Sequence, residues 1–210
     1  MKPIKKKALV FGGAFNPPTR AHIELGRYAM QKCNAERVIY VPTKETYIED
    51  SQKKDFAFSN EDRLHMLRMI SIDTPWMGVS DFEIMAAEQP RTYLTLQHLS
   101  EDYDCQLLIG SDKLKELENG WLYVRQIAEQ FGIAVISRGT DNAADIIAND
   151  SYLKEFSKYF TVIQAMPDYQ DMSSSEVRKE LISIQQKIQK LHDMVPEELN
   201  GLKEWMNKKL

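Results

Sequence analysis

The feature that most constrains the fold is a regular alternation of short apolar runs with helix-like segments. Runs rich in branched residues, as expected for buried strands, occur at 8–11, 37–41, 77–80, 106–109, 133–137 and 160–163. Segments with helical spacing separate them at about 20–33, 60–72, 92–102, 121–131 and 142–157. Such alternation is typical of a doubly wound parallel sheet with helices on both faces. We therefore predict an α/β fold of this type.

The C-terminal part is expected to be helical. Apolar residues recur there at helical spacing, at Val177, Leu181, Ile184, Ile188 and Leu191. Pro196 would open a last helix. No repeat or obvious linker divides the 210 residues, a length that suits one sizeable core. We expect a single domain over 1–210, in which about 173–210 form a C-terminal helical subregion.

Charge and cysteine content exclude several classes of protein. A net charge of −4 argues against non-specific binding to nucleic acids or membrane surfaces. The two cysteines, Cys33 and Cys105, are too few for a disulfide framework. The apolar run at 8–11 is too short for a signal-peptide core or a membrane span. We expect a cytoplasmic protein with neither nucleic-acid nor membrane partners, and the irregular segment 43–58 is a candidate binding loop.

The stretch 10–22, VFGGAFNPPTRAH, is the strongest functional motif. Gly12 and Gly13 end the first predicted strand, where absent side chains let a ligand approach the backbone, although a tight strand-to-helix turn would use the same residues. A dinucleotide fingerprint would need a third glycine and an acid after the second strand, which ends in YVPTK. A P-loop would need a Gly-Lys-Ser/Thr ending, where this chain has NPPT. Both motifs are excluded.

Thr19 and His22 lie three residues apart at the start of a predicted helix. Their hydroxyl and imidazole groups would point together from the first turn. The free amides of that turn and the helix dipole favour an anion. The histidine could then donate a hydrogen bond to phosphate oxygens, although a lone histidine is also compatible with packing or with the surface.

At this point the sequence resembles a known family. GGAFNPPTRAH is similar to the signature G-x-F-x-P-x-(H/T)-x-G-H of the nucleotidyltransferase superfamily. LLIGSDKLKELENGW resembles the strand and G-x-D segment of bacterial nicotinate-nucleotide adenylyltransferases, and IAVISRGT resembles their next strand. MSSSEVR resembles their I-S-S-T-x-I-R motif, and MVPEELNGLKEW resembles their terminal helix. The four segments that follow GGAFNPPTRAH occur in the order that the nicotinate-nucleotide adenylyltransferase family shows.

The resemblance implies an adenylyltransferase with a Rossmann-like nucleotidyltransferase fold. Such an enzyme moves AMP from ATP to the phosphate of nicotinate or nicotinamide mononucleotide in NAD biosynthesis, by direct in-line attack that releases pyrophosphate. Mg²⁺ would be the cofactor, with ATP as co-substrate. No protein nucleophile is needed, so catalysis consists of positioning and charge stabilisation.

The resemblance also implies roles for individual residues. His22, Thr19 and Arg178 would be catalytic, with His22 as the main stabiliser of developing negative charge. The ATP-binding residues would be Gly12, Gly13, Ala14, Phe15, Asp112, Arg138, Ser174 and Ser175. The acceptor nucleotide would be bound by Lys44, Thr92 and Trp121. Simpler interpretations stay open: an N-cap for Asp112, a surface arginine for Arg138, a mobile loop lysine for Lys44, a core residue for Trp121, and a serine-capped helix with a solvated arginine for 174–178.

The sequence departs from the family pattern at two places. Ala21 stands where the H-x-G-H turn has glycine, a mild and helix-favouring change. EQPRTYLTLQHL stands where the family has S-Y-T-x-x-T-L, and only Thr92, Thr95 and Leu96 match. This segment helps to form the pyridine-nucleotide pocket, so the acceptor stays open between nicotinate and nicotinamide. The alternatives are a transferase with another phosphorylated acceptor, such as phosphopantetheine, and a non-catalytic nucleotide-binding module.

Overall fold

The computed structural model describes residues 4–50, 58–137, 141–164, 175 and 177–183. The chain divides into two compact units, Met1–Met172 and Ser173–Leu210. In the second unit, residues 175 and 177–183 are described and lie in a helix, as the spacing of Val177 and Leu181 predicts. Ile184, Ile188, Leu191 and Pro196 lie outside the described residues. The single domain expected over 1–210 stays a prediction.

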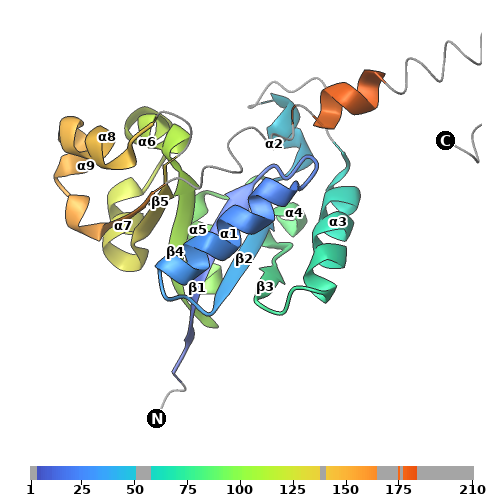
Figure 1. Cartoon of the computed structure of the whole chain (residues 1–210), viewed down its shortest axis with the longest axis horizontal. Coiled ribbons are helices and arrows are strands. Elements are labelled where there is room, and N and C mark those ends of the chain that lie inside the picture. Colours follow the sequence, from blue (N-terminus) through green and yellow to red (C-terminus); the bar gives the residue numbers. More distant parts are fainter. Residues whose placement is uncertain (1–3, 51–57, 138–140, 165–174, 176, 184–210) are drawn as a thin grey trace, which may run out of the picture. The chain divides into compact units, whose positions relative to one another are not determined.

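Six parallel strands form the sheet of the first unit in the described part of the chain. They are β1 (Lys6–Gly13), β2 (Arg37–Pro42), β3 (Met77–Val79), β4 (Tyr103–Gly110), β5 (Ile133–Ile136) and β6 (Phe160–Ile163). Their order is β3-β2-β1-β4-β5-β6 (Figure 1). Successive strands extend from β1 to one edge and then from β4 to the other, so the order reverses between β1 and β4. The predicted doubly wound α/β fold is confirmed.

Helices connect the strands along the chain. They are α1 (Arg20–Lys32), α2 (Glu45–Asp50), α3 (Asn60–Ile72), α4 (Phe82–Met85), α5 (Thr92–Leu99), α6 (Leu114–Gly120), α7 (Val124–Phe131), α8 (Ala143–Asn149) and α9 (Ser151–Lys154), with the 3-10 turns η1 (Ser111–Lys113) and η2 (Ser157–Tyr159). The sequence did not predict α2, α4 or α6. The helix predicted over 121–131 begins only at Val124, because Tyr123 has a φ of 66°.

The helix predicted over 142–157 is interrupted. Asp150 has an extended conformation, and its Oδ1 accepts a hydrogen bond from the backbone N–H of Leu153 at 2.9 Å. An aspartate in that position caps a new helix. The segment therefore contains α8, α9 and η2 instead of one helix.

The core has two layers, one on each face of the sheet. Successive strand residues point to opposite faces, so Ala8 and Val10 of β1 enter one layer and Leu9 enters the other. Residues of α1 and α3 pack in the layer that holds Leu9, and residues of α5, α6, α7 and α8 pack in the layer that holds Val10. Figure 1 shows α1 lying across its face of the sheet. Burial of both faces explains the continuous apolar strands.

Strands β1 and β4 separate at their carboxyl ends. Their pairing runs from Lys6 and Tyr103 to Phe11 and Leu108, and not beyond. Past this point β1 continues to pair with β2, as far as Gly13, while β4 continues with β5. Ligands of doubly wound sheets bind at the carboxyl ends of the strands where the order reverses. The predicted glycines therefore lie at the expected position.

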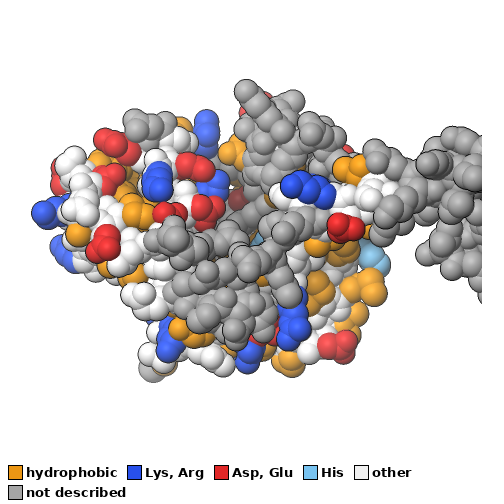
Figure 2. Space-filling view, turned by 45° about the horizontal axis from the view of Figure 1, so that its top comes forward, with side chains coloured by type: hydrophobic (Ala, Val, Ile, Leu, Met, Phe, Trp, Pro, Cys, Tyr) orange, Lys and Arg blue, Asp and Glu red, His pale blue; other side chains and the backbone are white. Residues whose placement is uncertain are grey.

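The surface near α6 to α9 carries charges of both signs. Figure 2 shows acidic and basic side chains interspersed over this end of the molecule. Lys113 pairs with Glu116 at 2.9 Å, and Arg125 pairs with Glu155. Exposed pairs of this kind contribute little stability. Within the described residues, no helix is both long and apolar enough to cross a membrane.

Candidate active site

The two glycines at the end of β1 have different roles. Gly12 is exposed, and a Cβ added there would meet no heavy atom within 4 Å. Its backbone is therefore accessible to a ligand. A Cβ on Gly13 would lie 3.3 Å from Cζ of Phe15, and the Gly13 carbonyl accepts a hydrogen bond from the Thr43 amide at 3.0 Å. Gly12 thus leaves open space, and Gly13 makes room for packing.

Phe15 turns the chain between β1 and α1. Its φ is 42°, which is uncommon for a residue with a side chain. Its ring is buried, 5.5 Å from the Tyr40 ring and 5.2 Å from the His22 imidazole between ring centroids. The next residue, Asn16, is also buried, and its Oδ1 accepts a hydrogen bond from the Phe58 amide at 2.8 Å. These contacts fix the loop beneath His22.

Thr19 and His22 meet, as predicted, although Thr19 caps α1 and does not lie within it. The backbone N–H of Thr19 donates to Nδ1 of His22 at 3.1 Å, and the Thr19 hydroxyl lies 2.7 Å from the same nitrogen. A histidine here takes the place of the glutamate in a capping box. An amide can only donate, so Nδ1 is the acceptor and the proton of the neutral ring is on Nε2. The cap therefore gives His22 a hydrogen-bond donor at Nε2.

Arg63 is a residue of this region that the sequence analysis missed. It is fully buried on α3. Its guanidinium donates to the carbonyl of Ala14 at 2.8 Å, to the carbonyl of Phe58 at 3.1 Å and to Oδ1 of Asn60 at 2.7 Å. Burial lowers the pKa of Arg63, and the Glu45 carboxylate opposes this effect. Arg63 therefore ties the loop after β1 to the start of α3.

Lys44, a predicted acceptor-binding residue, follows β2 and is held by α4. Its ammonium donates to the carbonyls of Ile84 at 2.8 Å and Ala86 at 2.6 Å, near the C-terminal end of α4. Cations are favoured at that end of a helix. Its backbone N–H donates to Oε1 of Gln89 at 2.8 Å. The ammonium has three N–H donors, so these two bonds leave one N–H of Lys44 for a further acceptor.

A buried carboxylate, Glu83, is linked to the Lys44 backbone through Gln89 and was also missed. Glu83 accepts hydrogen bonds from the Thr95 hydroxyl at 2.8 Å and from Nε2 of Gln89 at 2.5 Å. Burial raises the pKa of Glu83, and the two hydrogen bonds oppose this effect. Together with the bond from Lys44 to Gln89, these contacts link the end of β2 to α4 and α5. Thr92, another predicted acceptor residue, is the first residue of α5.

Comparison with known proteins identifies the family. A model described as cytidylyltransferase-like matches residues 10–180. A probable nicotinate-nucleotide adenylyltransferase from Caldicellulosiruptor bescii is 31% identical over 174 residues, 82% of this chain and 85% of the relative. The chain belongs to the nicotinate-nucleotide adenylyltransferase family.

Two further relatives extend this finding. A probable nicotinate-nucleotide adenylyltransferase from Clostridium acetobutylicum is 28% identical over 200 residues, 93% of this chain and 94% of the relative. The structure of Plasmodium falciparum nicotinic acid mononucleotide adenylyltransferase complexed with NaAD has a TM-score of 0.60 and 20% identity, and the match covers 83% of each chain. At that identity the structural likeness shows the fold, which this chain shares with a member of the family.

The remaining predicted residues of this family member occupy three kinds of place. Asp112 is exposed in η1, directly after β4, and is not an N-cap, because Gly110 and Lys113 cap η1 and α6. Trp121 lies between α6 and α7 and packs against the core, so its predicted place in a helix start is wrong. Arg138 and Ser174 lie outside the described residues.

In the second unit, Ser175 and Arg178 are neighbours on one helix. Nη2 of Arg178 donates to the Ser175 hydroxyl at 3.0 Å. Burial lowers the pKa of Arg178. The two residues are one helical turn apart, as the predicted anion site requires.

Proposed function

We propose that this chain transfers the AMP moiety of ATP to the phosphate of nicotinate mononucleotide and releases pyrophosphate. The observation that carries the proposal is the hydrogen bond from the Thr19 amide to Nδ1 of His22, which leaves the proton of the neutral ring on Nε2, in the first turn of the helix that follows the accessible backbone of Gly12. The family of the chain and the names of its relatives support this reaction and favour nicotinate over nicotinamide. NAD biosynthesis is the setting in which this product is used.

The chemistry requires charge stabilisation and no covalent intermediate. An oxygen of the acceptor phosphate attacks the α-phosphorus of ATP, and the bond from that phosphorus to the bridging oxygen breaks. Pyrophosphate leaves with the electron pair. We assign to His22 Nε2–H the donation of a hydrogen bond to phosphate oxygens as charge develops. The Thr19 amide and hydroxyl hold the imidazole in the required tautomer and orientation.

Mg²⁺ fits this reaction as an ion that arrives with ATP. Among the described residues, no group of three or more His, Cys, Asp or Glu side chains is arranged to hold a metal ion. Mg²⁺ commonly binds through substrate phosphates with one or two carboxylates and several waters, so such a cluster is not required. When bound, it would neutralise phosphate charge. We assign to Asp112, which is exposed directly after β4, a contact with ATP.

The other site residues belong to the same proposal. We assign Gly13, Ala14 and Phe15 to the ATP site through their backbone, together with Arg138, Ser174, Ser175 and Arg178. We assign Lys44, Thr92 and Trp121 to the acceptor nucleotide. Thr92 offers a helix N-terminus for an anionic group, and Trp121 offers an aromatic face for the pyridine ring.

The test is pyrophosphate release from ATP and Mg²⁺ with nicotinate mononucleotide and, in parallel, nicotinamide mononucleotide. We expect strong preference for the nicotinate compound. His22→Ala should lower kcat about a hundredfold or more, because a donor to the developing charge is lost. Thr19→Val should be milder, about tenfold, because the amide bond to Nδ1 remains. His65→Ala is the matched control, since His65 is exposed on α3.

Two results would contradict the proposal. Near-normal turnover by His22→Ala would remove the assigned role of the imidazole. No pyrophosphate release with either acceptor would contradict the assigned reaction. In that case a screen of other phosphorylated acceptors, phosphopantetheine included, would identify a related transferase. ATP binding without turnover by any of them would indicate a non-catalytic module.

A further inference from the structure

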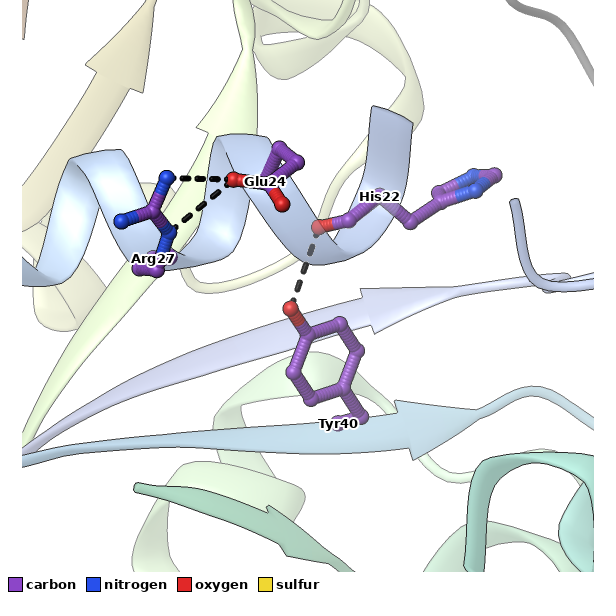
Figure 3. A network of polar contacts seen from close by, with 4 residues as sticks. All are labelled: His22, Glu24, Arg27 and Tyr40. Atoms are coloured by element: carbon purple, nitrogen blue, oxygen red, sulfur yellow. Dashed lines mark hydrogen bonds and ion pairs between the residues drawn. The ribbon is translucent and has the colours of Figure 1, made fainter. Parts of the chain in front are cut away.

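A buried tyrosine of the sheet is bonded to the residue that carries the imidazole. Tyr40 lies on β2 and has no exposed surface. Its hydroxyl donates to the backbone carbonyl of His22 at 3.0 Å, from the sheet side of α1 (Figure 3). In an α-helix that carbonyl also accepts the N–H of the residue four positions later, which here is Gly26. A carbonyl has two lone pairs, so both bonds can form. Tyr40 therefore fastens the first turn of α1 to β2.

The hydrogen bond from Tyr40 to His22 requires a glycine at position 26, which lowers the stability of the helix. It lies inside α1, where glycine is less favourable than alanine. A Cβ added to Gly26 would lie 2.1 Å from the Tyr40 hydroxyl oxygen and 3.1 Å from Cζ of Tyr40. The shorter distance is far below any contact that non-bonded carbon and oxygen atoms make. The helix therefore has a glycine where the tyrosine hydroxyl needs the space.

The Tyr40 ring also contacts the His22 imidazole indirectly, through Phe15. Its centroid lies 5.5 Å from that of Phe15, and Phe15 in turn lies 5.2 Å from the His22 imidazole at an interplanar angle of 70°. Burial raises the pKa of Tyr40, with the Glu24 carboxylate adding to the effect, so the hydroxyl stays protonated and can donate. Tyr40 thus holds the His22 backbone directly, and it contacts Phe15, which packs against the His22 ring.

We propose that Tyr40 and Gly26 are a matched pair whose function is to position the His22 imidazole for phosphate binding. Tyr40 is a positioning residue, because it acts through His22 and not on the substrate. The inference rests on the proposed function of His22 as a phosphate donor. A small displacement of such a donor weakens the binding of the transition state more than the binding of the substrate. The loss should therefore appear as a lower kcat and not as a higher KM.

The kinetic test uses two single variants and their combination. Tyr40→Phe should lower kcat about tenfold and change the KM for ATP by about twofold or less, because the imidazole loses its anchor but keeps its cap. Gly26→Ala should lower kcat further, because the new methyl group collides with the hydroxyl. Gly26→Ala combined with Tyr40→Phe should recover kcat above that of Gly26→Ala, since the hydroxyl that the methyl group meets is gone and the 3.1 Å contact with Cζ needs only a small shift. Tyr28→Phe, on the same helix, is the control.

Amide hydrogen exchange provides a readout independent of turnover. The first two turns of α1 should exchange faster in Tyr40→Phe and in Gly26→Ala than in the natural protein, and the double variant should be better protected than Gly26→Ala, because the collision with the hydroxyl is removed. This result would hold even if pyrophosphate release failed with every acceptor, so a wrong function and a wrong pairing can be told apart. Unchanged exchange in Tyr40→Phe, or a double variant impaired by the product of the single effects, would overturn the proposal. Equal loss in Tyr28→Phe would do the same.

Discussion

Replacing Arg63 with methionine removes three hydrogen bonds while keeping most of the buried side-chain volume. The carbonyls of Ala14 and Phe58 then lose the guanidinium, whereas Oδ1 of Asn60 keeps a bond from the Glu45 amide at 2.8 Å. A buried acceptor left without a partner costs about 1–3 kcal/mol. Ala14 and Phe58 are only half-buried, so each lost bond costs about 1–2 kcal/mol, toward the low end of this range, and removing a desolvated charge returns part of the sum. We expect the free energy of unfolding to fall by about 2 kcal/mol.

The same substitution should reduce activity in the protein that remains folded. Ala14 follows the glycines of the proposed ATP site, and Arg63 holds its carbonyl. Loss of that bond lets the loop move, and a displacement of about 1 Å near a reacting phosphate can cost about a hundredfold in rate. We expect kcat/KM for ATP to fall about tenfold to a hundredfold. Urea unfolding and pyrophosphate release, measured on the same preparation, separate the two effects.

Arg68→Met is the matched control for this prediction. Arg68 lies on the same helix and bonds to Oδ2 of Asp81 at 2.9 Å, but both side chains are about half exposed. A surface pair contributes about 0–1 kcal/mol, so this variant should keep its stability and activity. Arg63→Lys should fall between the two, because an ammonium keeps the charge but lacks the planar fork that reaches separate oxygens. If Arg63→Met loses no more stability than Arg68→Met, the reasoning is refuted.

Two further predictions concern buried titratable groups. The folded protein binds the Glu83 proton more tightly than the unfolded chain does, because burial raises the Glu83 pKa above 4.5. The stability of Glu83→Gln relative to the natural protein should therefore increase as pH rises from about 4.5, and this difference should become constant above the Glu83 pKa. Urea unfolding at several pH values measures it. Burial raises the pKa of Cys105 to about 12 and also raises that of Cys33. At pH 8 a thiol reagent should modify neither before unfolding and both after it; fast labelling of the folded protein would contradict this.

Local sequence patterns were sufficient to predict an element where the residues of that segment alone determine its structure. The six strands could be predicted because branched, apolar runs bury on both faces of a parallel sheet. The cap between Thr19 and His22 could be predicted in outline because the two residues are three positions apart. The start of α7 could not, because the left-handed conformation of Tyr123 is unusual for that residue type. The short α2, α4 and α6 gave too little periodicity to be recognised.

By itself the sequence determined the α/β class, the position of the glycines at the end of β1, and the family, since these depend on neighbouring residues and on the order of motifs. Only the tertiary structure decided which side chains hold the loop after β1 and the first turn of α1 in place. Arg63 meets Ala14 across 49 positions, and Tyr40 meets His22 across 18. Such contacts form only after the sheet and helices have packed. A buried arginine or an inner-helix glycine therefore has no local pattern that would reveal its partner.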